Sequence, residues 1–294
     1  MKYAYYPGCA SESTARDQHE SSLAIAKSLG LDFIEPDGWI CCGTTPAHHT
    51  DKLLSLSLPA ANLIKTQKMG FDMVVNCAAC YNRMKIANYE IQNNSKIRQS
   101  VNTAIGENYD GSVNVKHIIE VLLKDLGLEN LQKSLTHSLN GLKIASYYGC
   151  LLVRPKEATH FDDPENPTSM DRIVESLGGE SIDFPHKVEC CGGALTLTRP
   201  DIIIKLTDSI LNMAQKAGAE CIVVACPICQ MNLDLRQKDI EKQTGKRYNM
   251  PVIYITQLTG LCLGIRPRQL GLNKLIVSPS AVLNKISLKN VKDF

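Results

Sequence analysis

The sequence predicts an α/β protein of two pseudo-symmetric lobes, each a small parallel sheet with helices. Three observations support this fold class. The chain has 294 residues, more than one hydrophobic core usually accommodates. Its twelve cysteines include a pattern that occurs twice. Short apolar runs typical of buried parallel strands lead directly towards several of these cysteines.

The cysteine pattern is an internal repeat. Each half has a leading Gly-Cys, an adjacent cysteine pair followed by glycine, and a CxxC. The pair and the CxxC recur at one offset of 149 residues, and the leading cysteine recurs at an offset of 141 in similar surroundings. The repeated residues are Cys9, Cys41, Cys42, Cys77 and Cys80 in the first half and Cys150, Cys190, Cys191, Cys226 and Cys229 in the second. This regularity indicates a duplicated unit.

Four apolar segments are predicted as strands. Residues 3–6 and 142–148 each run to a glycine before a leading cysteine, and residues 72–76 and 221–225 each lead into a CxxC. The leading cysteine and the CxxC of each half therefore stand at the carboxyl ends of strands. Open parallel sheets bind their ligands at that edge.

Helical patterns lie between the strands. The clearest follows Pro200 and stops near Gly218; one face of it carries Ile203, Leu206, Ile210, Met213 and Ala214. An equivalent pattern after Asp51 contains Pro59, which predicts a kink or break there.

The repeat also predicts the domain boundaries. We expect one lobe at residues 1–135 and the other at 141–263, joined through the polar stretch 129–140. Residues 264–294 form a tail with Arg266, Pro267, Arg268 and scattered lysines. We expect this tail to pack across a lobe, to dock a partner or to form a plain surface segment.

Composition excludes several classes of function. The chain has 32 Lys and Arg against 30 Asp and Glu, and no long basic run, so nucleic acid is not an expected partner. No secretory signal opens the sequence, and no apolar stretch reaches the roughly 18–20 residues that span a bilayer. We expect a cytoplasmic protein without membrane insertion. Neither GxGxxG nor a P-loop occurs, so no flavin, nicotinamide or nucleotide is expected on this chain.

The cysteines point to metal or thiol chemistry, because a disulfide framework is not expected in a reducing compartment. A zinc site or an ordinary cubane cluster uses four cysteines, whereas each half has five. A turn at the glycine after the adjacent pair brings both sulfurs to one multi-iron body. The spacing thus favours an unusual iron–sulfur cluster over a single metal ion. Cys221 and Cys262 lie outside the repeat and are expected to be buried apolar thiols.

Other interpretations of the CxxC segments remain open. Cys226-Pro227-Ile228-Cys229 after a strand also fits a thioredoxin-type dithiol, although the three further cysteines of each set make this the weaker interpretation. Tyr81 and Gln230 follow the two CxxC segments where haem attachment requires histidine, so that class is excluded.

Cys41-Cys42-Gly43 and Cys190-Cys191-Gly192, each with an upstream Gly-Cys and a downstream CxxC, form the CCG motif in duplicate. Over residues 1–263 the chain resembles the family of the heterodisulfide reductase B subunit. The resemblance implies two non-cubane [4Fe-4S] clusters, one on each set of five cysteines. It also implies that the mixed disulfide of coenzyme M and coenzyme B is reduced to two thiols between them, by two one-electron transfers. Cys41, Cys42, Cys190 and Cys191 are then the expected catalytic residues.

The same resemblance implies two partner subunits, a small one with ordinary [4Fe-4S] clusters and another that contains flavin. Because both coenzymes are anions, positive charge is expected near the motifs. The candidates are Arg83, Lys85, Arg154, Lys156 and Arg199, and each is also compatible with a solvated surface position. His48 and His49 are candidate proton or hydrogen-bond donors, or structural histidines.

Two alternative functions remain open. One is an electron-transfer CCG-type subunit of another oxidoreductase, of the 2-hydroxy acid oxidase or thiol:fumarate reductase type. The other is a non-catalytic protein stabilised by zinc in one or both halves.

Overall fold

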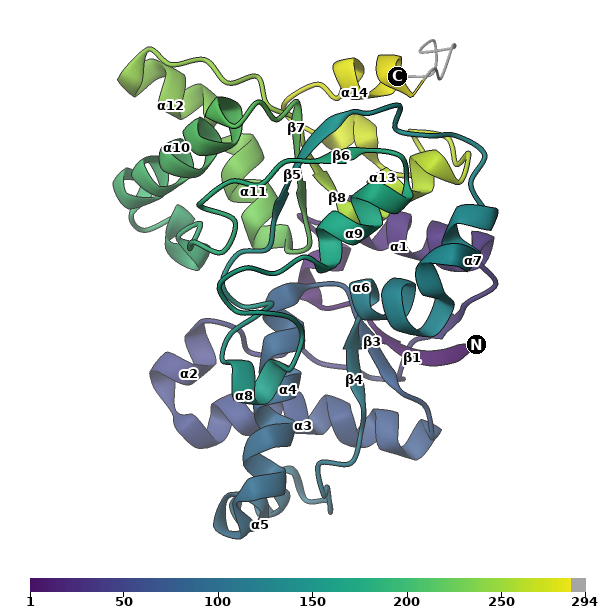
Figure 1. Ribbon diagram of the computed structural model, residues 1–294. Helices are drawn as coiled ribbons and strands as arrows, with labels where there is room; N and C mark the ends of the chain where they lie inside the picture. The colour runs from purple at the N-terminus through teal and green to yellow at the C-terminus, as the bar shows by residue number, and fades with distance from the viewer. Residues whose placement is uncertain (287–294) are drawn as a thin grey trace.

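The computed structural model describes residues 1–286, which form two stacked α/β halves (Figure 1). The strands of the first half all run parallel, in the order β2-β1-β3-β4. These strands are β1 Lys2–Tyr6, β2 Asp32–Ile34, β3 Met73–Val75 and β4 Val115–His117. The helices of this half are η1 Cys9–Glu12, α1 Arg16–Ser28, α2 Pro46–Thr50, α3 Lys52–Met69, α4 Ala78–Asn93, α5 Ser95–Ile105, α6 Ile118–Glu120, the π-helical η2 Val121–Gly127 and α7 Leu128–Lys133.

The second half repeats this topology. Its strands are also parallel, in the matching order β6-β5-β7-β8. The strands are β5 Lys143–Tyr147, β6 Glu180–Ser181, β7 Cys221–Val224 and β8 Val252–Tyr254. The helices are α8 Lys156–Thr159, α9 Ser169–Ser176, η3 Gly193–Thr196, α10 Pro200–Lys216, α11 Pro227–Leu235, α12 Gln237–Thr244, α13 Ile255–Cys262, η4 Leu272–Lys274 and α14 Ser280–Lys285. The predicted fold class, two small parallel sheets with helices, is confirmed.

The central strands explain how the sequence predicted the sheets. Every residue of β3 and β7 is buried, because helices cover parallel strands on both faces. All four predicted strands are present, and no end lies more than one residue from the position expected. The edge strands were not predicted, since two or three residues carry no readable periodicity.

Two expectations about helices need correction. Of the kink or break predicted at Pro59, the break is wrong, because α3 runs through this residue from Lys52 to Met69, and the kink stays a prediction. A proline removes one helical hydrogen bond, and packing of α3 on both α4 and α5 outweighs that loss. In α10 the buried face is rotated from the one expected: Leu206 and Met213 are only half-buried, and Ile204, Thr207 and Leu211 are buried instead.

Each half sends a helix onto the other (Figure 1). Helix α1 of the first half packs on α13 of the second, where the hydroxyls of Ser21 and Thr256 are 2.7 Å apart. Helix α8 of the second half packs on α4 of the first, where the Tyr81 hydroxyl donates to the carbonyl of Thr159 at 3.0 Å. The two halves are therefore joined by reciprocal contacts.

The described part of the tail, residues 264–286, packs across both halves. Lys274 forms an ion pair of 2.8 Å with Glu20 of α1. Asp234 of α11 accepts hydrogen bonds from the backbone of Ile276 and Val277 at 2.8 and 3.0 Å. The tail thus contacts one helix of each half; residues 287–294 lie outside the described part.

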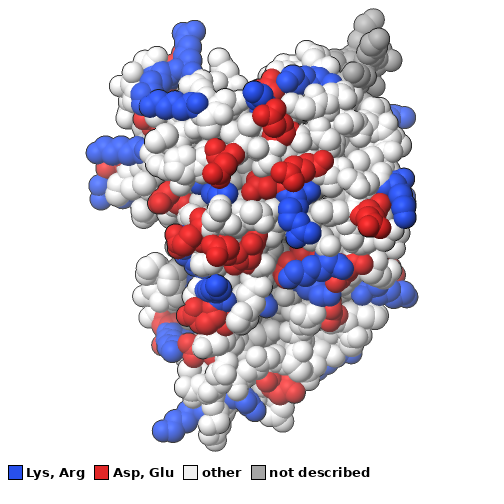
Figure 2. Space-filling model, viewed as in Figure 1, with Lys and Arg blue, Asp and Glu red and all other residues white. Residues whose placement is uncertain are grey.

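Cys221 and Cys262 are completely buried, as predicted for apolar thiols outside the repeat. No helix within residues 1–286 combines the length and apolarity needed to cross a bilayer. On the face seen in Figure 2, basic and acidic side chains are interspersed.

Candidate functional site

The ten repeated cysteines gather at the carboxyl ends of the central strands of both sheets. In the first half, the sulfur of Cys41 lies 3.6 Å from that of Cys9, and the sulfur of Cys42 lies 3.3 Å from that of Cys80. In the second half, the corresponding distance between the sulfurs of Cys191 and Cys229 is 3.5 Å. The sulfurs of each half thus form one group.

The two groups meet at the boundary between the halves. The thiols of Cys77 and Cys226, the first cysteines of the two CxxC segments, are close enough to shift each other's pKa, upward for Cys77 and downward for Cys226. A small apolar cavity adjoins this contact and takes Ala78 from the first half. Its remaining lining comes from the second half: Tyr148, Cys150, Leu151, Cys190, Cys191, Gly193, Cys226, Ile228 and Cys229.

The glycine before each leading cysteine is required by space. Gly8 and Gly149 both have a positive φ, of 78° and 64°. A Cβ atom on Gly8 would lie 3.1 Å from the sulfur of Cys80, and one on Gly149 would lie 3.2 Å from that of Cys229. Glycine therefore lets the chain turn while its backbone stays close to the CxxC.

The glycine after each cysteine pair is also required by space, and its backbone N–H contacts a sulfur. Gly43 and Gly192 have φ values of 74° and 93°, and a Cβ there would meet Leu58 at 2.6 Å and Ile203 at 2.1 Å. Their backbone N–H groups donate to the sulfurs of Cys41 and Cys190 at 3.4 and 3.3 Å. The turn thereby directs both sulfurs of a pair to the same group.

Two tyrosines that the sequence analysis treated only as strand residues hold the cysteine pairs in place. Tyr6 of β1 donates to the carbonyl of Ile40 at 2.8 Å, and Tyr147 of β5 donates to that of Glu189 at 2.6 Å. Each carbonyl belongs to the residue just before a pair, and burial raises the pKa of both phenols, which keeps them donors. Their shared position, three residues before a leading cysteine, was the available signal.

Each CxxC occupies a helix N-terminus. Cys77 is the N-cap of α4 and Cys226 is the N-cap of α11, so Cys80 and Cys229 lie in the first turn. The partial positive charge of a helix N-terminus favours negatively charged sulfur. These two helices are thus suited to hold thiolates.

The thiols share protons within each group. The pKa of Cys190 falls to about 6 because Cys150 donates a hydrogen bond to its sulfur, and the pKa of Cys150 rises for the same reason. In the first half, hydrogen bonds from Cys41 and Cys80 lower the pKa of Cys42 and raise their own. Such sets ionise completely only when a metal replaces the protons.

Exposure divides each set in the same way. Cys9 and Cys41 are exposed in the first half; in the second half Cys190 is exposed and Cys150 is half-buried. The six other repeat cysteines are buried: Cys42, Cys77, Cys80, Cys191, Cys226 and Cys229. A molecule arriving from solvent therefore meets the leading cysteine and the first cysteine of the pair.

The sulfurs do not surround single points. Within residues 1–286, no group of three or more Cys, His, Asp or Glu side chains is arranged to hold one metal ion. More than four sulfurs in each half, close glycine backbones and a helix N-terminus make up a donor set that fits a body larger than one ion.

One expected cation stands out by its position. Arg83 lies three residues after Cys80 on α4, close enough to Cys42 and His48 for their charges to interact. Its Nη2 donates to the side chain of Asn82 at 2.8 Å, and its Nε is buried without a hydrogen-bond partner. Within the described chain it has no carboxylate within 4.0 Å.

The other expected cations are less suited to bind a ligand. Arg154 pairs with Glu165 at 2.9 Å, and Arg199 pairs with its exposed neighbour Asp201 at 2.8 Å. Lys85 lies over the ring of Tyr81, with its Nζ 5.9 Å from the ring centroid. Lys156 is exposed at the start of α8.

The two candidate histidines lie on the surface. His48 and His49 are exposed on α2, with ring centroids 4.1 Å apart. The charge of Arg83 contributes to a lowered pKa of His48, after the loss of hydration. Of the two, His48 is the one coupled to Arg83.

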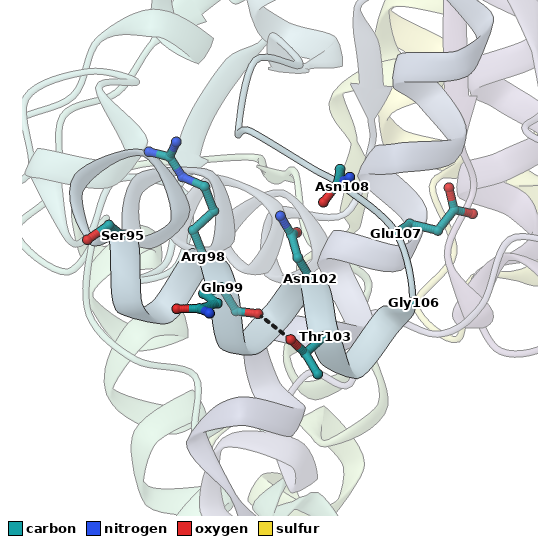
Figure 3. Close-up of a pocket in the computed structure, with 8 residues that line it drawn as sticks. All are labelled: Ser95, Arg98, Gln99, Asn102, Thr103, Gly106, Glu107 and Asn108. Carbon is teal, nitrogen blue, oxygen red and sulfur yellow. Dashed lines mark hydrogen bonds between the residues drawn. The ribbon is translucent and has the colours of Figure 1, made fainter.

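A larger hollow, lined by no cysteine, lies along α5 (Figure 3). Two of its hydrogen-bonding side chains already have partners: Arg98 donates to the carbonyls of Ile91 and Gln92, and the Asn102 side chain bonds the backbone of Tyr109. The hollow has about 430 Å³ and is lined by Ser95, Arg98, Gln99, Asn102, Thr103, Gly106, Glu107 and Asn108. It has no cysteine or histidine in its lining, and the Glu107 carboxylate is paired with Lys68, so we read the hollow as a solvated surface feature.

Comparison with known proteins adds a family. Residues 3–85 and 144–234 each match the sequence profile of the CCG family, described as a cysteine-rich domain. These ranges include all ten repeated cysteines.

Several relatives match along nearly their whole length. The chain is 34% identical to the 8-methylmenaquinol:fumarate reductase membrane anchor subunit of Wolinella succinogenes, over 94% of this chain and 97% of that protein. It is 31% identical to the B subunit of a ferredoxin/F420H2-dependent CoB-CoM heterodisulfide reductase of Methanosarcina acetivorans, over 97% of both chains. It is 30% identical to a protein of Archaeoglobus profundus named as similar to the heterodisulfide reductase B subunit, over 99% of both.

A solved structure supports the fold. A hypothetical protein from Helicobacter pylori superposes with a TM-score of 0.73 at 13% identity, over 94% of this chain. This chain spans 52% of that protein.

Proposed function

Because this chain belongs to the CCG cysteine-rich domain family, as its motifs predicted, we propose that it is the disulfide-reducing iron–sulfur subunit of a heterodisulfide reductase. The observation that carries this proposal is the meeting of two equivalent sulfur groups at one boundary, with exposed cysteines in both. Relatives named as the B subunit of such reductases, similar along nearly their full length, support it.

We assign one non-cubane [4Fe-4S] cluster to each set of five cysteines. We propose that the first cluster belongs to a domain at residues 1–135 and the second to a domain at 141–263, followed by a tail at 264–294. When bound, the two clusters would supply one electron each to a disulfide. Close glycine backbones, the tyrosines behind the pairs and the helix N-termini at each CxxC support this assignment.

The roles of the protein follow from exposure and charge. Cys41 and Cys190 stand at the solvent edge of their groups, so we propose that the disulfide approaches there. Cys42 and Cys191 lie behind them, buried from water. Arg83 is the cation that we propose for the acid group of a coenzyme, because it lies beside the first group and has no carboxylate partner in the described residues.

The proposed partners are two further subunits of the same complex. A small one would pass electrons in from its own ordinary [4Fe-4S] clusters, and a flavin-containing one would stand behind it. Relatives named as one subunit of a larger reductase support an assembly of several chains. We propose a cytoplasmic location.

A second function is favoured by one comparison. The relative with 34% identity is named as a subunit of an 8-methylmenaquinol:fumarate reductase, so an electron-transfer role without disulfide reduction is the alternative. The purified complex, assayed anaerobically with reduced viologen, distinguishes the two. Turnover of the coenzyme M–coenzyme B disulfide supports the first function, and fumarate reduction with no disulfide turnover supports the alternative.

The cofactor assignment is tested on the anaerobically purified chain. We expect about eight irons and about eight acid-labile sulfides per chain, with a paramagnetic signal on oxidation or reduction. About two zinc ions and no sulfide would overturn the assignment in favour of a zinc-stabilised protein. Four irons with one zinc would restrict the cluster to one half.

A further inference from the structure

One buried side chain joins the segments that carry the two CxxC motifs. The Nε2 of Gln18, on α1, donates to the carbonyl of Asn76 at 2.9 Å and to that of Ala225 at 3.3 Å. Asn76 and Ala225 are the residues immediately before Cys77 and Cys226. Gln18 is only 3% exposed, so water does not compete for these bonds.

The orientation of this amide is defined by its partners. Both acceptors are backbone carbonyls, which have no hydrogen to donate, so the NH₂ group and not the oxygen of Gln18 must face them. An NH₂ group has two hydrogens, one for each carbonyl. Asparagine has the same group but is one methylene shorter, and methionine has a similar length but no donor.

The helix that carries Gln18 is itself fixed to the second half. Besides the contact of Ser21 with Thr256, the side chain of Gln257 on α13 donates to Asp17 at 3.3 Å. Helix α1 lies beside α13 in Figure 1, although the two helices belong to different halves. Gln18 therefore connects two CxxC segments from a helix anchored in both halves.

A buried histidine braces the same place. His117, at the end of β4, is completely buried, and its Nε2 lies 2.9 Å from the backbone carbonyl oxygen of Asn76. Its Nδ1 accepts the backbone N–H of Ile119 at 3.3 Å, so Nε2 carries the proton. The Ala225 carbonyl is also close enough to influence the pKa of His117. Neither carbonyl is free to move without disturbing its donors, and Gln18 is the side chain that bonds both.

We propose that Gln18 is a positioning residue that fixes the separation of the two sulfur groups. The inference rests on the proposed function, because one disulfide must be within reach of two one-electron centres at once. Displacements near 1 Å in such an arrangement cost roughly a hundredfold in rate. A side chain that sets this separation is therefore part of the machinery for a two-electron reaction, even though it touches no substrate.

The test compares Gln18→Met with Gln237→Met in the anaerobic protein carrying its clusters. Gln237 is a matched control: it is also buried, and its Nε2 donates to the carbonyls of Leu233 and Met250, neither of which adjoins a cysteine. The measurements are iron and sulfide content, the magnetic interaction between the clusters by paramagnetic resonance, and disulfide reduction.

We expect both variants to retain wild-type iron. In Gln18→Met the splitting that reports the interaction between clusters should change or broaden, and disulfide reduction should fall about 10- to 100-fold. Gln237→Met should keep the wild-type splitting and the wild-type rate of disulfide reduction. If Gln18→Met fails to fold, Gln18→Asn keeps a donor that reaches one carbonyl and should show the same changes.

Two results would distinguish failure of this inference from failure of the proposed function. A wild-type protein without two clusters contradicts the proposed function. A wild-type protein with two interacting clusters, together with a Gln18→Met variant of unchanged splitting and rate, overturns only the positioning role.

Discussion

At the scale of single residues, the glycine of each CCG motif is tightly constrained by space. This glycine is recognisable in the sequence from its place after two cysteines, and the structure supplies the reason in side chains of α2, α3 and α10. The shortest of these contacts are with Leu58 and Ile203, which follow their glycines by 15 and 11 positions, too far apart for a local pattern to reveal.

Gly192→Ala should destabilise the protein and lower its iron content. The new Cβ would lie 2.1 Å from Ile203 at a φ of 93°, so both steric overlap and backbone strain oppose it. We expect a loss of about 2–4 kcal/mol in the free energy of unfolding. Gly218→Ala is the control, since its φ is 87° but nothing lies within 4 Å. Equal losses in thermal unfolding for both variants would assign the effect to backbone strain alone.

Arg83→Gln should weaken binding of an anionic disulfide. Removing a charge-assisted hydrogen bond costs about 1.5–3 kcal/mol, so KM should rise roughly 10- to 100-fold with a smaller change in kcat. Arg199→Gln serves as the control, because that guanidinium is exposed and paired with Asp201. A change in kcat or in cluster potential with constant KM would contradict substrate binding by Arg83.

At the scale of elements, the strands and most helices follow from apolar patterns, whereas contacts between elements do not. Helix α1 illustrates the difference. Its buried face is mostly polar, with Asp17, Gln18, Ser21 and Ser22, so periodicity of apolar residues gives no sign that it packs on α13. Gln18 lies 58 and 207 residues from its two partners, and no local motif predicts such bonds.

The contact between α1 and α13 should make stability depend on pH. Burial raises the pKa of Asp17 to about 6, above the ordinary value of 3.8. An acid with a raised folded pKa destabilises the fold once it ionises, so stability declines as pH rises from about 4 to about 6. Asp17→Asn removes this effect and should be more stable than the wild type by up to about 3 kcal/mol at pH 8.

Unfolding of the anaerobic protein in urea at pH 5 and pH 8 measures this difference. The difference in the free energy of unfolding between Asp17→Asn and the wild type should be larger at pH 8 than at pH 5. Glu175→Gln, an exposed acid on α9, controls for the loss of one negative charge. A smaller difference in unfolding free energy at pH 8 than at pH 5 would show that the attraction between Asp17 and Lys274 outweighs the cost of burying the charged carboxylate.

At the scale of the whole molecule, duplication is the property that the sequence predicts best. A repeat of ten cysteines at nearly constant offsets led to two lobes of one topology, and both sheets have the matching strand order. Cysteines at the carboxyl ends of strands in both lobes made two facing lobes the expected arrangement, and the family resemblance added a substrate between the two sulfur groups. The meeting of these groups depends on how whole halves pack, which spacing along a chain does not encode.

Cys41→Ala and Cys190→Ala should each remove disulfide reduction while leaving about half of the iron. Reduction needs two electrons, so one remaining cluster does not suffice. Cys262→Ala is the matched control, because this thiol is buried outside the repeat. Normal turnover in either motif variant, prepared without oxygen, would count against the proposed reaction.

The reciprocal packing of α1 on α13 and of α8 on α4 has a consequence for dissection of the gene. A fragment ending near residue 138 would contain α1 without α13 and α4 without α8. The complementary fragment would contain α13 and α8 without the helices on which they pack. We therefore expect neither fragment to fold stably by itself. Produced together from separate open reading frames, however, they should recognise each other and assemble by complementation, because every contact between them is retained when only the linker is cut.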